Sequence, residues 1–90
     1  MNDQRRKQIR KLIKKLEDMR CDITARVEEI TELQEEEQEY LYNMPESLQY
    51  ADKGLKAEAA IDLLSEAAST LDSMYCDLED VLENLNTAQE

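Results

Sequence analysis

The groups of this chain that could take part in chemistry are carboxylates, amines, guanidiniums and two thiols, because the sequence contains no histidine. Without an imidazole, no serine or cysteine nucleophile can be paired with a histidine base. The carboxylates lie in runs such as Glu28–Glu29 and Glu35–Glu37, whose members point in different directions around a helix. Neither a glycine-rich phosphate loop nor the spacing of a calcium loop occurs. We therefore expect no enzymatic activity, no metal site and no cofactor.

The two cysteines, Cys21 and Cys76, could form a disulfide only if their side chains faced each other across paired helices. With about 100° of helical turn per residue, Cys21 points away from the side occupied by Ile23, and Cys76 points away from that of Leu78. The sequence thus predicts two free thiols, as expected in a reducing compartment. No Cys-x-x-Cys spacing indicates a zinc site.

Basic residues gather at the start of the chain. Residues 1–20 carry eight Lys or Arg and three Asp or Glu, a net charge of +5, whereas residues 21–90 carry three and nineteen, a net charge of −16. The basic cluster could bind the phosphates of a small nucleotide or of nucleic acid, or it could pair with the acidic end of a second helix. The candidate anion-binding residues are Arg5, Arg6, Lys7, Arg10, Lys11 and Lys14.

The acidic remainder of the chain limits the choice of partner. It repels nucleic acid and anionic membranes, and it suits a protein with a basic surface. The basic cluster also lacks aromatic residues that could stack on bases, so nucleic acid is the less favoured partner. No apolar run approaches the roughly 20 residues that a membrane span needs, and no secretory signal pattern is present. The expected location is the cytoplasm.

Two long helices must position these groups, because apolar residues recur at spacings of three and four. Arg26 and Glu37 interrupt the first stripe, and polar residues at such positions can fix the register of helix pairing. Arg26 could reach Asp72 or Glu66 on the second helix, or its head could extend to water. The first stripe consists of Ile9, Leu12, Leu16, Met19, Ile23, Ile30, Leu33 and Tyr40, widened by Ile13, Val27 and Leu41.

Breaks in the middle of the chain set the helix boundaries. The first helix is expected over about residues 3–42, with Asn2 or Asp3 as its N-cap. Pro45 then interrupts the hydrogen-bond ladder. Asn43 and Glu46 form the pattern of a capping box for a short turn through residue 49. The second helix is expected over about residues 53–86, capped by Asp52, so that residues 43–52 form the loop.

Short connections make consecutive helices antiparallel neighbours. The sequence therefore predicts one all-α domain, residues 1–90, folded as an antiparallel two-helix hairpin. Two helices can cover only part of each apolar stripe, so we expect the chain to self-associate. The expected product is a homodimer that forms a four-helix bundle, or a larger helical oligomer. Side chains near the loop could close the end of this bundle or dock a foreign protein. The candidates are Tyr40, Tyr42, Met44, Leu48 and Tyr50.

The segment from Asn43 to Gln49, followed by residues 56–61 and a helix rich in Ala, Leu and Glu, resembles small uncharacterised acidic helical-hairpin proteins of phages and prophages. In that family a basic start leads into an acidic helix, an Asn-x-Pro-Glu break and a second helix. The family implies no known activity. A phage origin implies a non-enzymatic inhibitor of a bacterial host defence system that occupies a host protein or sequesters its ligand in the host cytoplasm. The alternatives are a structural or assembly coiled-coil protein, and a protein that binds nucleotides or nucleic acid through its basic N-terminal helix.

Overall fold

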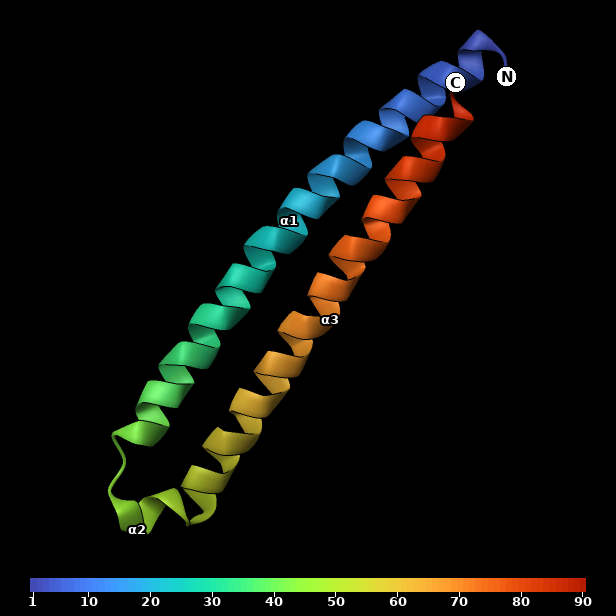
Figure 1. Ribbon diagram of the computed structural model, residues 1–90. Helices are drawn as coiled ribbons and strands as arrows, with labels where there is room; N and C mark the ends of the chain where they lie inside the picture. Colours follow the sequence, from blue (N-terminus) through green and yellow to red (C-terminus); the bar gives the residue numbers. More distant parts are fainter.

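The computed structural model describes residues 1–90, which form a helical hairpin without β-strands (Figure 1). Its elements are α1 (Asp3–Tyr42), α2 (Glu46–Gln49) and α3 (Asp52–Ala88). The two long helices run antiparallel, so both termini lie at one end of the rod and α2 lies at the other (Figure 1). The molecule measures 68 × 14 × 13 Å. The expected all-helical hairpin is confirmed, and no helix contains a segment long and apolar enough to cross a membrane.

Helix α1 has the bounds expected from the sequence, and its N-cap is Asn2. The side-chain oxygen of Asn2 accepts a hydrogen bond of 2.8 Å from the backbone N–H of Arg5. This bond satisfies one of the N–H groups that the first turn of a helix leaves without a partner. Asp3 is the first helical residue, where its negative charge interacts favourably with the helix dipole.

Two expected caps near α2 are wrong. Pro45, rather than Asn43, is the N-cap of α2 and makes no side-chain cap bond, so the capping box with Glu46 does not form. Asn43 instead ends α1, where its backbone N–H donates to the carbonyl of Glu39 at 3.0 Å. The N-cap of α3 is Ala51 without a side-chain cap bond, and Asp52 is already helical. Both corrections have the same cause, because the residue at the N-cap position, Pro45 or Ala51, has no side-chain acceptor for a hydrogen bond.

The two long helices meet along a seam with a seven-residue repeat. Apart from Ala25, Thr31 and Ala60, every residue of α1 and α3 whose surface is mostly covered belongs to this seam. In α1 it comprises Arg6, Ile13, Arg20, Val27, Gln34 and Leu41, together with Ile9, Leu16, Ile23, Ile30 and Glu37. In α3 it comprises Gly54, Ile61, Ala68, Tyr75, Leu82, Ala57, Leu64, Leu71, Leu78 and Leu85. Such a repeat is typical of an antiparallel coiled coil.

Contacts between the helices define the register of the seam. The guanidinium of Arg20 lies 4.0 Å from the ring centroid of Tyr75, and Arg6 Nε donates to the carbonyl of Gln89 at 3.0 Å. The two contacts are separated by fourteen residues in each helix. The helices therefore keep one register over this stretch. Because they are antiparallel, a step forward along α1 and an equal step backward along α3 lead to residues at the same level.

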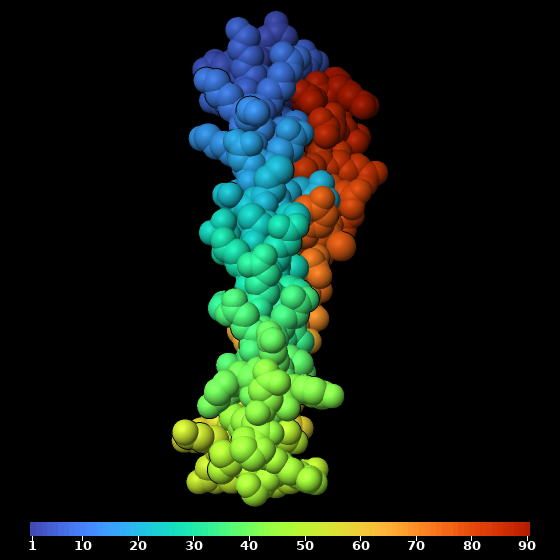
Figure 2. Space-filling view, turned by 90° about the vertical axis from the view of Figure 1, so that its left-hand side faces the viewer, coloured from blue at the N-terminus to red at the C-terminus, as the bar shows by residue number.

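The hairpin encloses very little core. Only five of the 90 residues are buried, and four of these are apolar: Ile13, Ala57, Ile61 and Leu82. The accessible surface is 6937 Å², whereas a compact protein of 10.5 kDa exposes about 5,400 Å². The narrow rod in Figure 2, seen from the side of α1, explains the difference, since no third layer covers either helix.

Candidate interaction surface

One side of the rod carries a series of large apolar side chains that the seam does not bury, whereas the other exposed apolar residues of the long helices, such as Leu55 (52% exposed) and Leu63 (65% exposed) of α3, lie outside this series. In each helix the members of the series recur every seven residues next to the seam, and about half of each large side chain of the series is exposed, from 41% for Val81 to 52% for Leu33. We call this surface the apolar face. It consists of Leu12, Met19, Leu33 and Tyr40 of α1 with Ala60, Ala67, Met74 and Val81 of α3.

Both helices contribute to the same side of the rod at the apolar face. Met19 of α1 and Met74 and Val81 of α3 line one shallow groove of about 200 Å³. The seam residues Ile23 and Leu78 also line the groove, together with one acidic residue, Asp77. The apolar face is therefore continuous across the hairpin. Its shape is suited to contact with another apolar surface rather than to binding a small molecule in a pocket.

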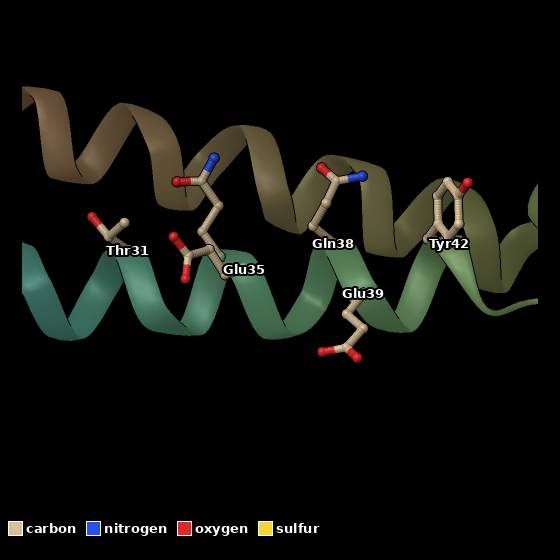
Figure 3. Close-up of a pocket in the computed structure, with 6 residues that line it drawn as sticks. Thr31, Glu35, Gln38, Glu39 and Tyr42 are labelled. Atoms are coloured by element: carbon tan, nitrogen blue, oxygen red, sulfur yellow. The ribbon is translucent and has the colours of Figure 1, made fainter.

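The opposite side of the rod is polar. Its hollows are open, and the largest, of about 510 Å³, is lined by Thr31, Gln34, Glu35, Gln38, Glu39 and Tyr42. In Figure 3 the side chain of Glu39 points away from α3 and does not converge with those of Gln38 and Tyr42. A site for a small ligand needs a mostly apolar lining with a few converging polar groups. Tyr42 is the one hydrophobic residue that lines this hollow, and its polar groups do not converge.

Arg20 is a seam residue that the sequence interpretation missed. Its guanidinium stacks on Tyr75, and its terminal nitrogen lies 3.9 Å from Glu79 Oε2, while its Nε is buried without a hydrogen-bond partner. The signal was present in the sequence, because Arg20 falls seven residues after Ile13 and seven before Val27. As a polar seam residue, Arg20 is suited to hold the two helices in one register.

Arg26 and Glu37, the expected register residues, lie in different surroundings. Arg26 is part of the side that carries the apolar face, and its only ion pair is with Glu29 of the same helix, at 3.4 Å. It does not reach Asp72 or Glu66 within the chain. Glu37 is half-buried in the seam and forms no ion pair. A role of Arg26 in register therefore has to involve a surface outside this hairpin.

Replacing Arg26 by leucine tests that role. We expect Arg26→Leu to raise the free energy of unfolding by about 1 kcal/mol, because an extra half-buried leucine joins the apolar face. We also expect more than one oligomeric species, since the polar residue that restricts pairing is gone. Urea denaturation and sedimentation velocity measure the two effects. Lys14→Leu is the control, because Lys14 is exposed away from the apolar face and carries the same charge. Equal results for the two variants would contradict a register role.

The candidate anion-binding residues do not converge on one site. Arg6 and Arg10 contact the end of α3: Arg6 also donates to the carbonyl of Glu90 at 3.5 Å, and Arg10 Nε donates to Gln89 Oε1 at 3.2 Å. Arg6 additionally pairs with Asp3 at 3.1 Å. The other candidates are exposed and form no ion pair, and none of the six lines a hollow of the surface. These exposed residues are Arg5, Lys7, Lys11 and Lys14.

The candidate docking residues near α2 are mostly exposed, but they face different directions. Tyr40 belongs to the apolar face, Tyr42 (81% exposed) lines the large polar hollow, and Tyr50 (77% exposed) lines a further hollow with Gln38 and Ile61. The remaining two are the half-buried Met44 and the exposed Leu48. The structure therefore leaves tyrosines accessible at this end of the rod without joining them into one patch.

Cys21 and Cys76 are exposed and unpaired, which confirms the expectation of two free thiols. No group of three or more Cys, Asp or Glu side chains is arranged to hold a metal ion. Comparison of the chain with protein-family models, with curated proteins and with solved structures finds no match. The interpretation of function therefore depends on the surfaces described above.

Proposed function

We propose that the protein is a non-enzymatic binding protein that self-associates and acts by occupying a partner with a basic surface. The separation of charge along the rod is the observation that carries this proposal. Residues 21–75 contain fourteen Asp or Glu and three Lys or Arg, a net charge of −11, whereas residues 1–20 and 76–90 together contain eight of each. The half of the hairpin near α2, which we call the acidic half, therefore holds the whole net charge of the chain.

The charges of the acidic half are available to a partner. All fourteen acidic side chains except Glu37 are exposed, and only Glu29 forms an ion pair. Residues 21–42 extend for about 33 Å at ~1.5 Å per residue. The acidic half thus carries about one net negative charge per 3 Å of rod. This spacing is close to the ~3.4 Å between phosphates along a DNA strand. A basic surface that binds nucleic acid would be attracted to this half and steered onto it.

The resemblance to phage proteins suggests which partner this is. A phage-encoded protein of this kind would occupy a basic protein of a bacterial host defence system, in the host cytoplasm, and block its nucleic-acid site. Sequestration of a small anionic nucleotide is the other route to the same end. Occupation of a protein is favoured over sequestration, because the basic side chains at the start of α1 do not enclose a site within the chain.

Affinity capture from a bacterial host lysate with a matched pair of baits tests the proposal. One bait carries Glu→Gln at Glu28, Glu32, Glu35 and Glu39, four exposed residues of the acidic half. The control bait carries Asp3→Asn, Glu17→Gln, Asp18→Asn and Glu83→Gln, which change the net charge equally outside that half. We expect a protein that the native and control baits retain and the first bait loses, with at least tenfold lower recovery. It should elute as NaCl is raised, because surface electrostatics are screened by salt. Equal recovery by the two variants would contradict the proposal.

A structural or assembly protein is the second candidate, and the apolar face favours it. Such a protein needs only its coiled-coil contacts, so the acidic half would serve solubility alone. In that case the bait with four neutralised acids would assemble normally and retain the same proteins as the native chain. Mass spectrometry of small molecules released from the native bait would detect a bound nucleotide if sequestration were the function.

A further inference from the structure

We infer that the apolar face binds a second copy of this chain in antiparallel orientation, with the two-fold axis beside Arg26. This inference rests on the self-association in the proposed function and adds its geometry. In this arrangement α1 lies along α1 of the second copy, and α3 lies along α3 of the second copy. The four helices then form a bundle in which both apolar faces are inside and both polar sides are outside.

The amount of exposed surface agrees with a partner of this size. The chain exposes 6937 Å², roughly 1,500 Å² more than a compact protein of its mass. A standard protein interface buries about 800 Å² on each side. A second hairpin covers the apolar face over its whole length, whereas the polar side offers no comparable apolar series. The excess surface is therefore enough for one extended interface on this side of the rod.

The distribution of side-chain volume favours the antiparallel orientation. The seam register brings Met19 within two residues of the level of Met74, and Leu33 within two residues of the level of Ala60, fourteen residues away along each helix. A parallel pair would place four methionines in one layer, and two leucines with two alanines in another. An antiparallel pair centred on Arg26 places Met19 against Leu33 of the second copy and Met74 between Ala60 and Ala67 of the second copy. Each layer then combines large and small residues, as close packing of a core requires.

The apolar series in α1 is itself symmetric about Arg26. Leu12 and Tyr40 lie fourteen residues before and after it, and Met19 and Leu33 lie seven before and after it. A two-fold axis at this level therefore brings every large residue of the series in α1 against another large residue of the second copy. Ala67, which lies within two residues of the level of Arg26 in α3, leaves room for the arginine side chain beside the axis.

Charge favours the same orientation. A parallel pair would align two acidic halves, each with a net charge of −11. An antiparallel pair aligns each acidic half with the neutral half of the other copy. Along α1, residues 1–20 with a net charge of +5 then lie beside residues 21–42 of the second copy, with a net charge of −7. Like charges placed together oppose association, so the antiparallel pair is the electrostatically favoured one. The free basic side chains of α1 also find their counter-charges in this pair.

A spin-label distance measurement tests the orientation. Gln8 is exposed and forms no hydrogen bond through its side chain, so Gln8→Cys in a chain with Cys21→Ser and Cys76→Ser gives one label site per copy. Gln8 lies eighteen residues from Arg26, which in the antiparallel pair separates the two labels by about 54 Å along the rod at ~1.5 Å per residue. In a parallel pair the labels lie at one level, within about 30 Å, given interhelical distances of about 8–10 Å and the length of the label arms.

Double electron–electron resonance on the labelled protein should give a distance of about 55–60 Å between the labels. Mixing this variant with a second one, labelled at Ser47→Cys, should give a new distance below about 30 Å, because these positions come level only in the antiparallel pair. A short distance between two labels at Gln8 would overturn the inferred orientation while leaving self-association in place. A monomeric mass in sedimentation equilibrium at micromolar concentration would overturn the self-association as well.

Discussion

The double substitution Met19→Glu with Leu33→Glu is expected to convert the assembled protein into a monomer that melts at a lower temperature. Both side chains lie on the apolar face and are about half exposed in the single hairpin, at 50% and 52%. Covering the remaining half of each contributes about 1 kcal/mol, and a dimer contains four such side chains, about 4 kcal/mol in all. This corresponds to a dissociation constant about a thousand times larger. Sedimentation equilibrium measures the mass, and circular dichroism measures the melting temperature.

The control for this prediction is Thr24→Glu with Gln38→Glu. These two residues lie on the polar side of α1 and are exposed, and the pair adds the same negative charge to the same helix. We expect the control to keep the native mass at the same protein concentration and to melt within a few degrees of the native protein. If both double variants dissociated equally, charge rather than the apolar face would control assembly. Unchanged mass in the first variant would exclude this face as the interface.

The fold followed from patterns that are local in the sequence. The spacing of apolar residues from Ile9 to Tyr40, the proline at position 45 and the shortness of the connection are enough to predict two antiparallel helices. The free thiols followed from helical geometry alone, because the direction of Cys21 or Cys76 depends only on its position along a regular helix. Predictions of this kind succeed because they need no knowledge of which surfaces meet.

The division of the apolar stripe could not be predicted in the same way. The sequence interpretation placed Leu12, Met19 and Leu33 in one seam with Leu16 and Ile23, since all of them lie on one broad side of the helix. In the structure α3 covers Leu16 and Ile23 and leaves the other three half exposed. Residue type does not distinguish the two groups, because a residue facing its own hairpin and one facing a second copy are equally apolar. Only the position of α3 separates them.

The seam also contains polar residues that a hydrophobic pattern passes over. Arg20 and Gln34 occupy positions in the seven-residue series of Ile13 and Val27. The residues that the seam covers are therefore not the same as the apolar residues of the helix. Arg20 is held there by the ring of Tyr75, fifty-five residues away in the sequence. A contact over such a distance depends on the register of the hairpin, which the spacing within one helix does not determine.

Replacing Gly54 by alanine is expected to lower the free energy of unfolding by about 1–3 kcal/mol, the usual effect of forcing an extra carbon into a packed site. Gly54 is buried in the first turn of α3, where α3 meets α2. A Cβ atom there would overlap the backbone carbonyl group of Gln49 and lie 2.6 Å from its Cα. The obstacle is backbone, so it cannot be relieved by rotating a side chain. Relief requires α2 to move, which would also strain the bond from Gln49 Nε2 to the carbonyl of Met44.

The sign of this effect distinguishes packing from helix propensity. In the interior of a helix, alanine is more favourable than glycine by about 0.8–1.0 kcal/mol, so propensity alone predicts that Gly54→Ala stabilises the protein. Urea denaturation at one protein concentration measures the difference, since the proposed self-association would make stability depend on concentration. Lys53→Ala, at the exposed neighbouring position, is the control and should change stability by less than about 0.5 kcal/mol. Stabilisation by Gly54→Ala would mean that α2 does not pack closely on α3, and that the tip of the hairpin is free to take other conformations.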